Sequence, residues 1–208
     1  MIDKNVFLAF FTTSVILALS PGPDNLFVMA QSARKGRMTG LFVTLGLATG
    51  LLGHTVAVAF GLAALLRAST IWFSILKFIG AAYLFFLAWQ AFRAGVSTAA
   101  KEEVQAISKE NLYRRGIIMN LTNPKVSLFF MAFLPQFADP RHGSMMLQFF
   151  QLGGIFIMAT MLVFGVISFV AGGLGERFSN SAIAQKVVNR TAAAVFIGLA
   201  VKLALSER

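Results

Sequence analysis

The stretch Ser20-Pro21-Gly22-Pro23-Asp24-Asn25 interrupts an apolar segment, Val6 to Ala30, that is long enough to cross a bilayer. Proline inside a helix removes a backbone donor and clashes with the preceding turn, so the helix cannot be continuous here. In hydrocarbon, the freed backbone groups are tolerated only where they face protein or a watery cavity. Asp24 is the only acidic residue within an apolar segment of the chain. An acidic group at membrane depth beside a broken helix indicates a transport site.

The composition is that of an integral membrane protein. Of 208 residues, 57% are hydrophobic and 12% are charged, and the mean hydropathy is +0.76, whereas soluble domains carry about 25% charged residues. The net charge of +10 does not indicate nucleic acid, because the basic residues lie in short loops and form no stripe or motif. The chain has no cysteine and only two separated histidines, His54 and His142. We therefore expect no metal site and no cofactor.

Six apolar segments are expected to span the membrane, so the predicted fold is all-α. Their expected ranges are 6–30, 38–66, 70–92, 116–138, 145–174 and 187–205. The first is expected to be a span rather than a cleaved signal peptide, because Ser-Pro-Gly-Pro follows it instead of a small-x-small cleavage site.

The basic residues predict the orientation of these spans. Most of them fall in the loops after the first, third and fifth spans: Arg34, Lys35, Arg37, Arg93, Lys101, Lys109, Arg114, Arg115, Arg177, Lys186 and Arg190. The other side carries Lys4, Arg67, Arg141, Lys202 and Arg208. Because positive residues stay in the cytoplasm, both termini are expected to be periplasmic.

The chain is expected to consist of two similar halves, residues 1–93 and 114–208, joined by a polar cytoplasmic linker at 94–113. The third span contains Phe78-Ile79-Gly80-Ala81-Ala82-Tyr83-Leu84, and the sixth contains the similar Phe196-Ile197-Gly198-Leu199-Ala200-Val201-Lys202. The first span of each half also carries internal proline. Three spans per half make the repeats inverted, and interrupted helices at matching places in such repeats indicate a transporter binding site.

Asp24 and its neighbours form the first part of the predicted site. Asp24 is interpreted as a proton-carrying or ammonium-binding carboxylate, with helix N-capping as the alternative. Asn25 either caps the second half-helix or donates to substrate. Carbonyl groups freed near Ser20 are expected to meet the substrate ammonium.

Asn123-Pro124-Lys125 marks the second break. Lys125, together with the helix N-terminus after Pro124, is interpreted as the receptor of a substrate carboxylate. The alternatives are that Lys125 snorkels to the cytoplasmic surface or forms a gating ion pair with Asp24. Lys77 and His54 are weaker candidates, because snorkelling and helix packing also explain them.

These motifs resemble the lysine/homoserine/threonine exporter family (LysE/RhtB). Ser20-Pro21-Gly22-Pro23-Asp24-Asn25, Leu76-Lys77-Phe78-Ile79-Gly80-Ala81-Ala82-Tyr83-Leu84 and Leu121-Thr122-Asn123-Pro124-Lys125 carry the resemblance. It implies a bacterial inner-membrane exporter of amino acids, driven by protons and assembled as a homodimer. By matching motif positions, the resemblance implies that the first break is formed by Pro21, Gly22, Pro23 and Asp24. It implies that the second is formed by Asn123, Pro124 and Lys125.

The function expected from the sequence is export of homoserine, threonine or another small neutral amino acid by proton antiport, not catalysis. No nucleophile–base pair, phosphate-binding loop or dinucleotide fingerprint occurs in the chain. Two alternatives remain, a passive channel for small polar solutes and a membrane scaffold that transports nothing.

Overall fold

The computed structural model describes residues 2–20, 22–62, 70–93, 108–179 and 182–205, and these residues are helical or in short connections. The elements are α1 (Lys4–Leu19), α2 (Pro23–Lys35), α3 (Arg37–Ala57), η1 (Val58–Leu62), α5 (Thr70–Arg93), α6 (Lys109–Leu121), α7 (Pro124–Leu128), η2 (Phe129–Phe133), η3 (Leu134–Phe137), η4 (Pro140–His142), α8 (Met145–Ser179) and α9 (Ala182–Leu205).

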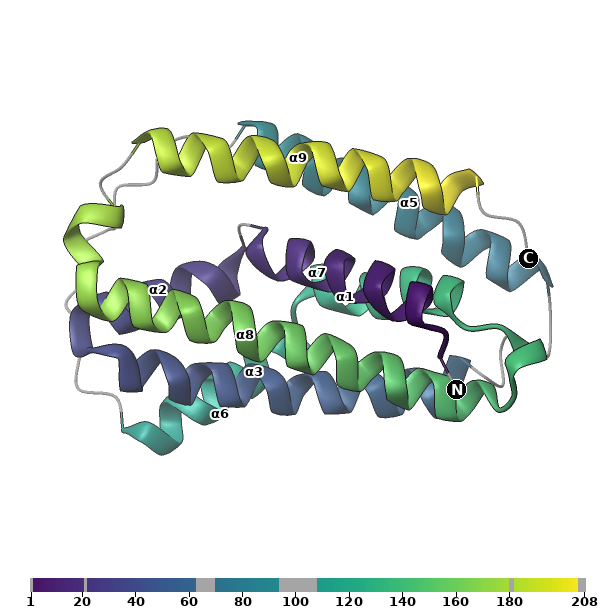
Figure 1. Ribbon diagram of the computed structural model, residues 1–208, viewed down its shortest axis with the longest axis horizontal. Helices are drawn as coiled ribbons and strands as arrows, with labels where there is room; N and C mark the ends of the chain where they lie inside the picture. Colours follow the sequence, from purple (N-terminus) through teal and green to yellow (C-terminus); the bar gives the residue numbers. More distant parts are fainter. Residues whose placement is uncertain (1, 21, 63–69, 94–107, 180–181, 206–208) are drawn as a thin grey trace.

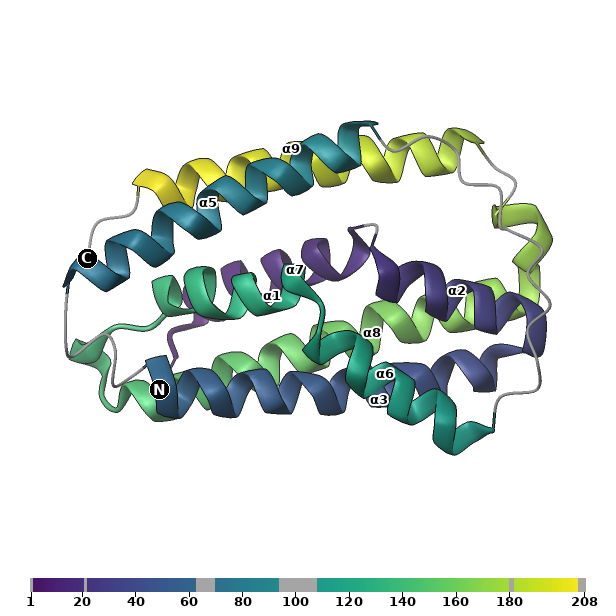
Figure 2. The same ribbon diagram turned by 180° about the vertical axis from the view of Figure 1, so that it is seen from behind.

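The long helices run roughly parallel to one axis of the molecule (Figure 1). Helix α5 packs against α9, whereas α3 packs against both α6 and α8. The half-helices α1, α2 and α7 lie between these two groups (Figures 1 and 2). The start of α1 and the end of α9 are at the same end of the molecule.

Two helix pairs are bent at the predicted proline positions. Helices α1 and α2 meet at 64°, and α6 meets the segment Pro124–Phe137 at 48°. By length and apolarity, two of the described helical segments, Arg37–Gly61 and Met145–Gly173, can cross a membrane, or up to four if each bent pair counts as one span. An all-helical membrane fold is therefore present in the described part of the chain.

Glycine allows helices α3 and α6 to cross closely. A Cβ atom on Gly46 would overlap the Tyr113 carbonyl oxygen and lie 3.0 Å from the Cα of Gly116. A Cβ on Gly116 would likewise overlap the Val43 carbonyl oxygen. Small residues let membrane helices approach backbone to backbone, and Gly46 and Gly116 allow this approach between α3 and α6.

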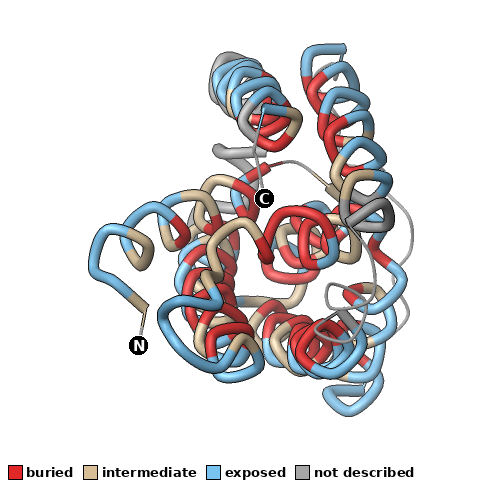
Figure 3. The backbone as a smooth tube through the Cα atoms, turned by 90° about the vertical axis from the view of Figure 1, so that its right-hand side faces the viewer, coloured by how far each residue is buried: buried red, intermediate tan, exposed pale blue. Residues whose placement is uncertain are grey.

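Buried aromatic rings form the core between the broken helices. Phe10, Phe129, Phe130 and Phe133 are at most 2% exposed, and the Phe10 ring lies 5.9 Å from that of Phe129. Seen along the long axis, buried residues occupy the inward faces and exposed ones the outward faces (Figure 3). Many of the exposed side chains are large and apolar, as expected where helices face lipid.

Some helix boundaries differ from the sequence-based expectation. Helix α6 begins at Lys109 rather than near Gly116, because Ser108 caps it by accepting a hydrogen bond from the Asn111 amide at 3.3 Å. Helix α9 begins at Ala182 rather than near Val187. Residues 94–107 of the predicted linker lie outside the described residues.

Candidate functional site

The first break separates α1 from α2 at residues 20–22. The Ser20 amide still donates to the Ile16 carbonyl at 3.0 Å, and Gly22 is extended, with φ −173° and ψ 176°. Pro23 then takes the first position of α2, where the missing N–H costs nothing. Pro21, also predicted to belong to the site, lies outside the described residues.

The second break separates α6 from α7 at residues 122–123. Asn123 caps α7 because its Oδ1 accepts a hydrogen bond from the Lys125 amide at 3.0 Å. Pro124 follows at the first helical position, as Pro23 does in the first half. Both breaks therefore begin a new helix with proline, but only the second has a side-chain cap.

The two breaks meet, so residues about one hundred positions apart form one cluster. The Asn123 side chain donates from Nδ2 to Oδ2 of Asp24 at 2.8 Å. Lys125 Nζ donates to the carbonyl oxygens of Ser20 at 3.1 Å and Leu17 at 3.3 Å. A helix leaves its last carbonyl groups without partners, and a cation at that end is favourable. Lys125 therefore supplies the missing donors at the end of α1.

Both charged side chains of the cluster are buried. Asp24 is 3% exposed and Lys125 is 7% exposed. These two described side chains form no ion pair within 4.0 Å of each other. Lys125 therefore points to the first break rather than to the cytoplasmic surface, and the predicted gating ion pair with Asp24 is not formed in this structure.

Three buried oxygens at the first break have no hydrogen-bond partner among the described residues. They are Oγ of Ser20, Oδ1 of Asp24 and Oδ1 of Asn25. Asn25 uses its Nδ2 to donate to the Ala18 carbonyl at 2.7 Å, which adds a second donor at the end of α1. Buried oxygens of this kind are rare in folded proteins and call for an explanation.

The two weaker candidates, His54 and Lys77, lie on α3 and α5. His54 Nε2 is 3.2 Å from the Asn120 carbonyl oxygen, and the His54 ring packs 5.6 Å from the Phe130 ring. Lys77 is half-buried on α5, with its ammonium 4.9 Å from the centre of the Phe78 ring. His54 thus adjoins the second break through Asn120, whereas Lys77 contacts the Phe78 ring of its own helix.

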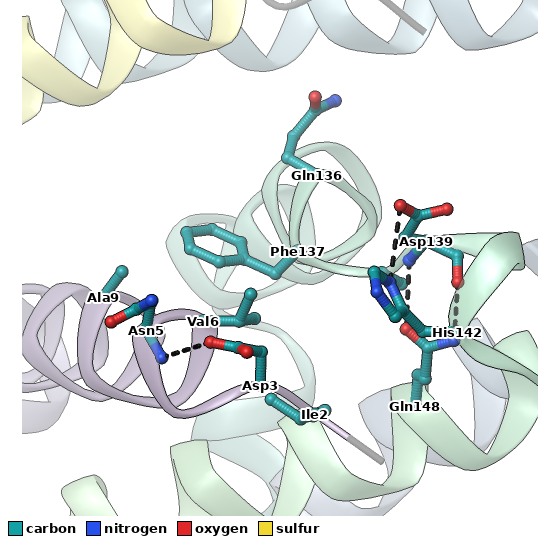
Figure 4. A pocket seen from close by; sticks show the side chains of 11 residues that line it. Ile2, Asp3, Asn5, Val6, Ala9, Gln136, Phe137, Asp139, His142 and Gln148 are labelled. Atoms are coloured by element: carbon teal, nitrogen blue, oxygen red, sulfur yellow. Dashed lines mark hydrogen bonds and ion pairs between the residues drawn. The ribbon is translucent and has the colours of Figure 1, made fainter.

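A separate cavity of about 410 Å³ lies near the start of α1 (Figure 4). Its polar lining includes Asp3, Asn5, Gln136, Asp139 and His142. Sequence reasoning did not find this cavity, because its walls come from α1, the segment after α7 and the start of α8, and no motif spans them. Along the chain, Phe10 lies between the lining residue Ala9 and the first break, and Phe129 lies between Lys125 and the lining residue Gln136. Both rings are buried.

Charge in this cavity is set by its loop residues. Asp139 forms an ion pair with Arg141 at 2.7 Å and lies 3.4 Å from His142 Nδ1. Hydrogen bonds from the Arg141 side chain and backbone lower the pKa of the Asp139 carboxyl to about 2. Asp139 is thus a carboxylate with its own counter-ion, unlike Asp24.

Comparison with known proteins shows which family this chain resembles. The family model described as LysE type translocator matches residues 15–207. A homoserine/homoserine lactone efflux protein of Salmonella typhi is 39% identical over 155 residues, which cover 74% of this chain and 75% of that protein.

Two further relatives match nearly the whole chain. An uncharacterized membrane protein of Pseudomonas aeruginosa is 34% identical and covers 91% of this chain and 90% of its own. One of Vibrio cholerae is 32% identical, with 99% of both chains covered. No solved structure matches.

Proposed function

Because the chain belongs to the LysE type translocator family, we propose that it exports a small neutral amino acid from the bacterial cytoplasm by proton antiport. The observation that carries this proposal is the contact between the two broken helices, through Asn123 and Asp24 and through Lys125 and the end of α1. Opposite charges at one buried point match a zwitterionic substrate. The name of the Salmonella relative supports homoserine or a similar amino acid as substrate.

The proposed architecture has six spans in two inverted repeats. Two contacts support this proposal, because α3 packs against α8 and α5 packs against α9, and each contact joins corresponding helices of the two halves. In the same scheme, α1 and α2 form the first span and α6 with Pro124–Phe137 forms the fourth. Residues 1–93 and 114–208 are then the repeats, in the inner membrane, with both termini periplasmic and two copies forming a homodimer.

The proposed substrate and coupling site comprises the residues around both breaks. They are Ser20, Pro21, Gly22, Pro23, Asp24, Asn25, Asn123, Pro124 and Lys125. Asp24 is the proposed proton carrier, since it is a buried carboxylate without a contacting cation. Proton uptake from the periplasmic side would weaken its attraction for the substrate ammonium and favour release.

The test uses inverted membrane vesicles that contain the protein, with an imposed inside-acid gradient. Uptake of a panel of labelled amino acids is measured with and without an uncoupler, for the wild type and for Lys125→Ala. Lys109→Ala is the matched control, because Lys109 is an exposed lysine at the start of α6. We expect uncoupler-sensitive accumulation of one amino acid that is lost only in Lys125→Ala.

The same experiment separates the alternatives. Uptake that reaches equilibrium and does not depend on the proton gradient indicates a passive channel. The absence of uptake of any amino acid contradicts the proposed function. Asp24→Asn tests the coupling step. If that variant accumulates substrate with an unchanged pH dependence, Asp24 is not the proton carrier.

A further inference from the structure

We infer that the cavity near the start of α1 is a second binding site for the exported amino acid, at the end of the molecule that is expected to be periplasmic. Four phenylalanine rings close this site off from the broken-helix cluster. The inference rests on the proposed function and deepens it, because it says where the amino acid binds before it leaves the protein.

Two segments of the chain join the cavity to the cluster. Helix α1 leads from the lining residue Ala9 to Ser20, whose carbonyl oxygen accepts a hydrogen bond from Lys125. At a rise of 1.5 Å per residue, Ala9 lies about 16 Å from Ser20 along the helix axis. The second segment leads back from Lys125 through η2 and η3 to the lining residues Gln136 and Phe137. A solute that leaves the cluster along these two segments arrives in the cavity.

Four aromatic rings on these two segments, which we call the phenylalanine quartet, form a closed cycle of contacts. The centre of the Phe10 ring lies 5.0 Å from that of Phe137 and 5.9 Å from that of Phe129. Phe133 completes the cycle, with its ring centre 5.0 Å from Phe129 and 5.2 Å from Phe137. Phe137 also lines the cavity, whereas Phe129 follows Lys125 by about one helical turn. The quartet therefore lies between the cavity and the cluster.

The quartet closes the path in this structure. Phe10, Phe129 and Phe133 are at most 2% exposed. A polar solute that crosses this apolar layer would lose its hydrogen bonds to water without gaining others, which is costly. The rings must therefore separate for an amino acid to pass from the cluster to the cavity.

The segment that carries three of the four rings is an irregular helix. Residues Phe129–Phe133 form a π-helix, and Leu134–Phe137 continue as a 3₁₀-helix. Such departures from α-helical hydrogen bonding are frequent at functional sites and hinges. A change of helix type in this segment would turn its rings relative to α1. Because the rings are joined by aromatic packing, they can separate without leaving a polar group unpaired.

The cavity has the size and the lining for a small zwitterion. Its volume of about 410 Å³ falls within the roughly 300–1,000 Å³ of ligand-binding clefts. Its lining combines the Asp3 and Asp139 carboxylates with the Asn5 amide (Figure 4). Carboxylates accept hydrogen bonds from an ammonium, and amides donate them to a carboxylate. Gln148 fixes this wall, since its side-chain amide bonds twice to the Asp139 backbone.

Cysteine accessibility tests the barrier, because the natural chain has no cysteine. Ser20→Cys places one thiol in the cluster, and a membrane-impermeant methanethiosulfonate reagent is added on the side from which Ser144→Cys reacts. The thiol of Ser20→Cys should react slowly. Combined with Phe10→Ala, it should react at least about tenfold faster, because two aromatic contacts that hold the quartet closed are lost.

Phe196→Ala is the matched control, because Phe196 is also a buried phenylalanine, 2% exposed, but belongs to α9. It should leave the labelling rate of Ser20→Cys unchanged. Phe10→Leu is a second variant in case Phe10→Ala does not fold, since leucine keeps much of the apolar volume and removes the ring contacts. We expect an intermediate labelling rate for it.

Protection by substrate tests the cavity as a binding site. Ala9→Cys places a thiol in the cavity wall, and threonine is added at rising concentration on the same side as the reagent. Labelling of Ala9→Cys should slow at least about threefold once the cavity is mostly occupied. Labelling of Ser144→Cys, at an exposed position just before α8, should stay unchanged. If threonine is not carried, the amino acid identified in the vesicle panel replaces it.

The results separate this inference from the proposed function. An exporter in which Ser20→Cys reacts equally fast with and without Phe10→Ala contradicts the barrier. An exporter whose substrate does not protect Ala9→Cys contradicts the second binding site. Either result overturns the inference and leaves the export function standing, whereas the absence of any amino-acid transport contradicts both.

Discussion

At the scale of single residues, Asn123 does two things with one side chain. Its Oδ1 caps α7 through the Lys125 amide, and its Nδ2 holds Asp24. An ionised aspartate at this position could still cap the helix but could not donate to Asp24. Asparagine is thus the residue type that joins a helix start to a buried carboxylate.

We expect Asn123→Ala to abolish export and to destabilise the protein. Losing the cap costs about 1 kcal/mol, and leaving the buried carboxylate oxygen unpaired costs about 1–3 kcal/mol more. Thermal unfolding in detergent and vesicle uptake measure the two effects. Asn123→Asp separates them, since it should retain the cap and still lose export. Export by Asn123→Asp at the wild-type rate would contradict the role of the bond to Asp24.

Asp139 provides a prediction about pH. Its pKa is lowered from the ordinary value of 3.8 to about 2, first by hydrogen bonds from Arg141. A carboxyl whose pKa is lowered in the folded state stabilises the protein at pH values above its unfolded-state pKa. This stabilisation is lost only as the pH falls towards 2. Asp139 therefore keeps its charge throughout the range from about pH 5 to 8 in which export is assayed. Asp139→Asn should leave the pH profile of export unchanged, and a displaced profile would place a coupling group in this loop.

At the scale of helices, the α3–α6 crossing depends on glycine. We expect Gly46→Ala to destabilise the protein by about 1–3 kcal/mol, because the new methyl group would overlap the Tyr113 carbonyl oxygen. Gly154→Ala on α8 is the control, since no described atom outside its own stretch of helix lies within 4 Å of its Cβ position. It should be neutral or stabilise the helix by up to about 1 kcal/mol. Thermal unfolding in detergent compares the two, and equal melting temperatures would contradict the close crossing.

The sequence predicted helix positions better than it predicted contacts between helices. Proline has local effects on the backbone, so both breaks were predictable from Pro21, Pro23 and Pro124. The direction of the Lys125 side chain was not, because reaching the Leu17 and Ser20 carbonyls depends on how α7 lies beside α1. The cavity near Asp3 was missed for the same reason, since its walls come from three separate stretches of chain.

At the scale of the whole molecule, different helices begin at the two ends of the long axis. The start of α1 and the start of α8 lie at one end, and the starts of α3 and α6 lie at the other (Figure 1). The basic residues Arg34, Lys35, Arg37 and Lys109 flank the starts of α3 and α6. The positive-inside rule therefore predicts that this second end is cytoplasmic.

Cysteine labelling tests that orientation directly, because the natural chain contains no cysteine. Ser144→Cys and Glu110→Cys each place one thiol at an exposed position on either side of the bent segment formed by α6 and Pro124–Phe137. In intact cells, a membrane-impermeant maleimide should label Ser144→Cys, and should label Glu110→Cys only after the membrane is permeabilised. The reverse labelling pattern would show that the protein has the opposite orientation, with the end that contains the cavity in the cytoplasm. Labelling of both in intact cells would mean that the bent segment enters and leaves on one side, so that Lys125 would lie in a re-entrant loop rather than in a broken span.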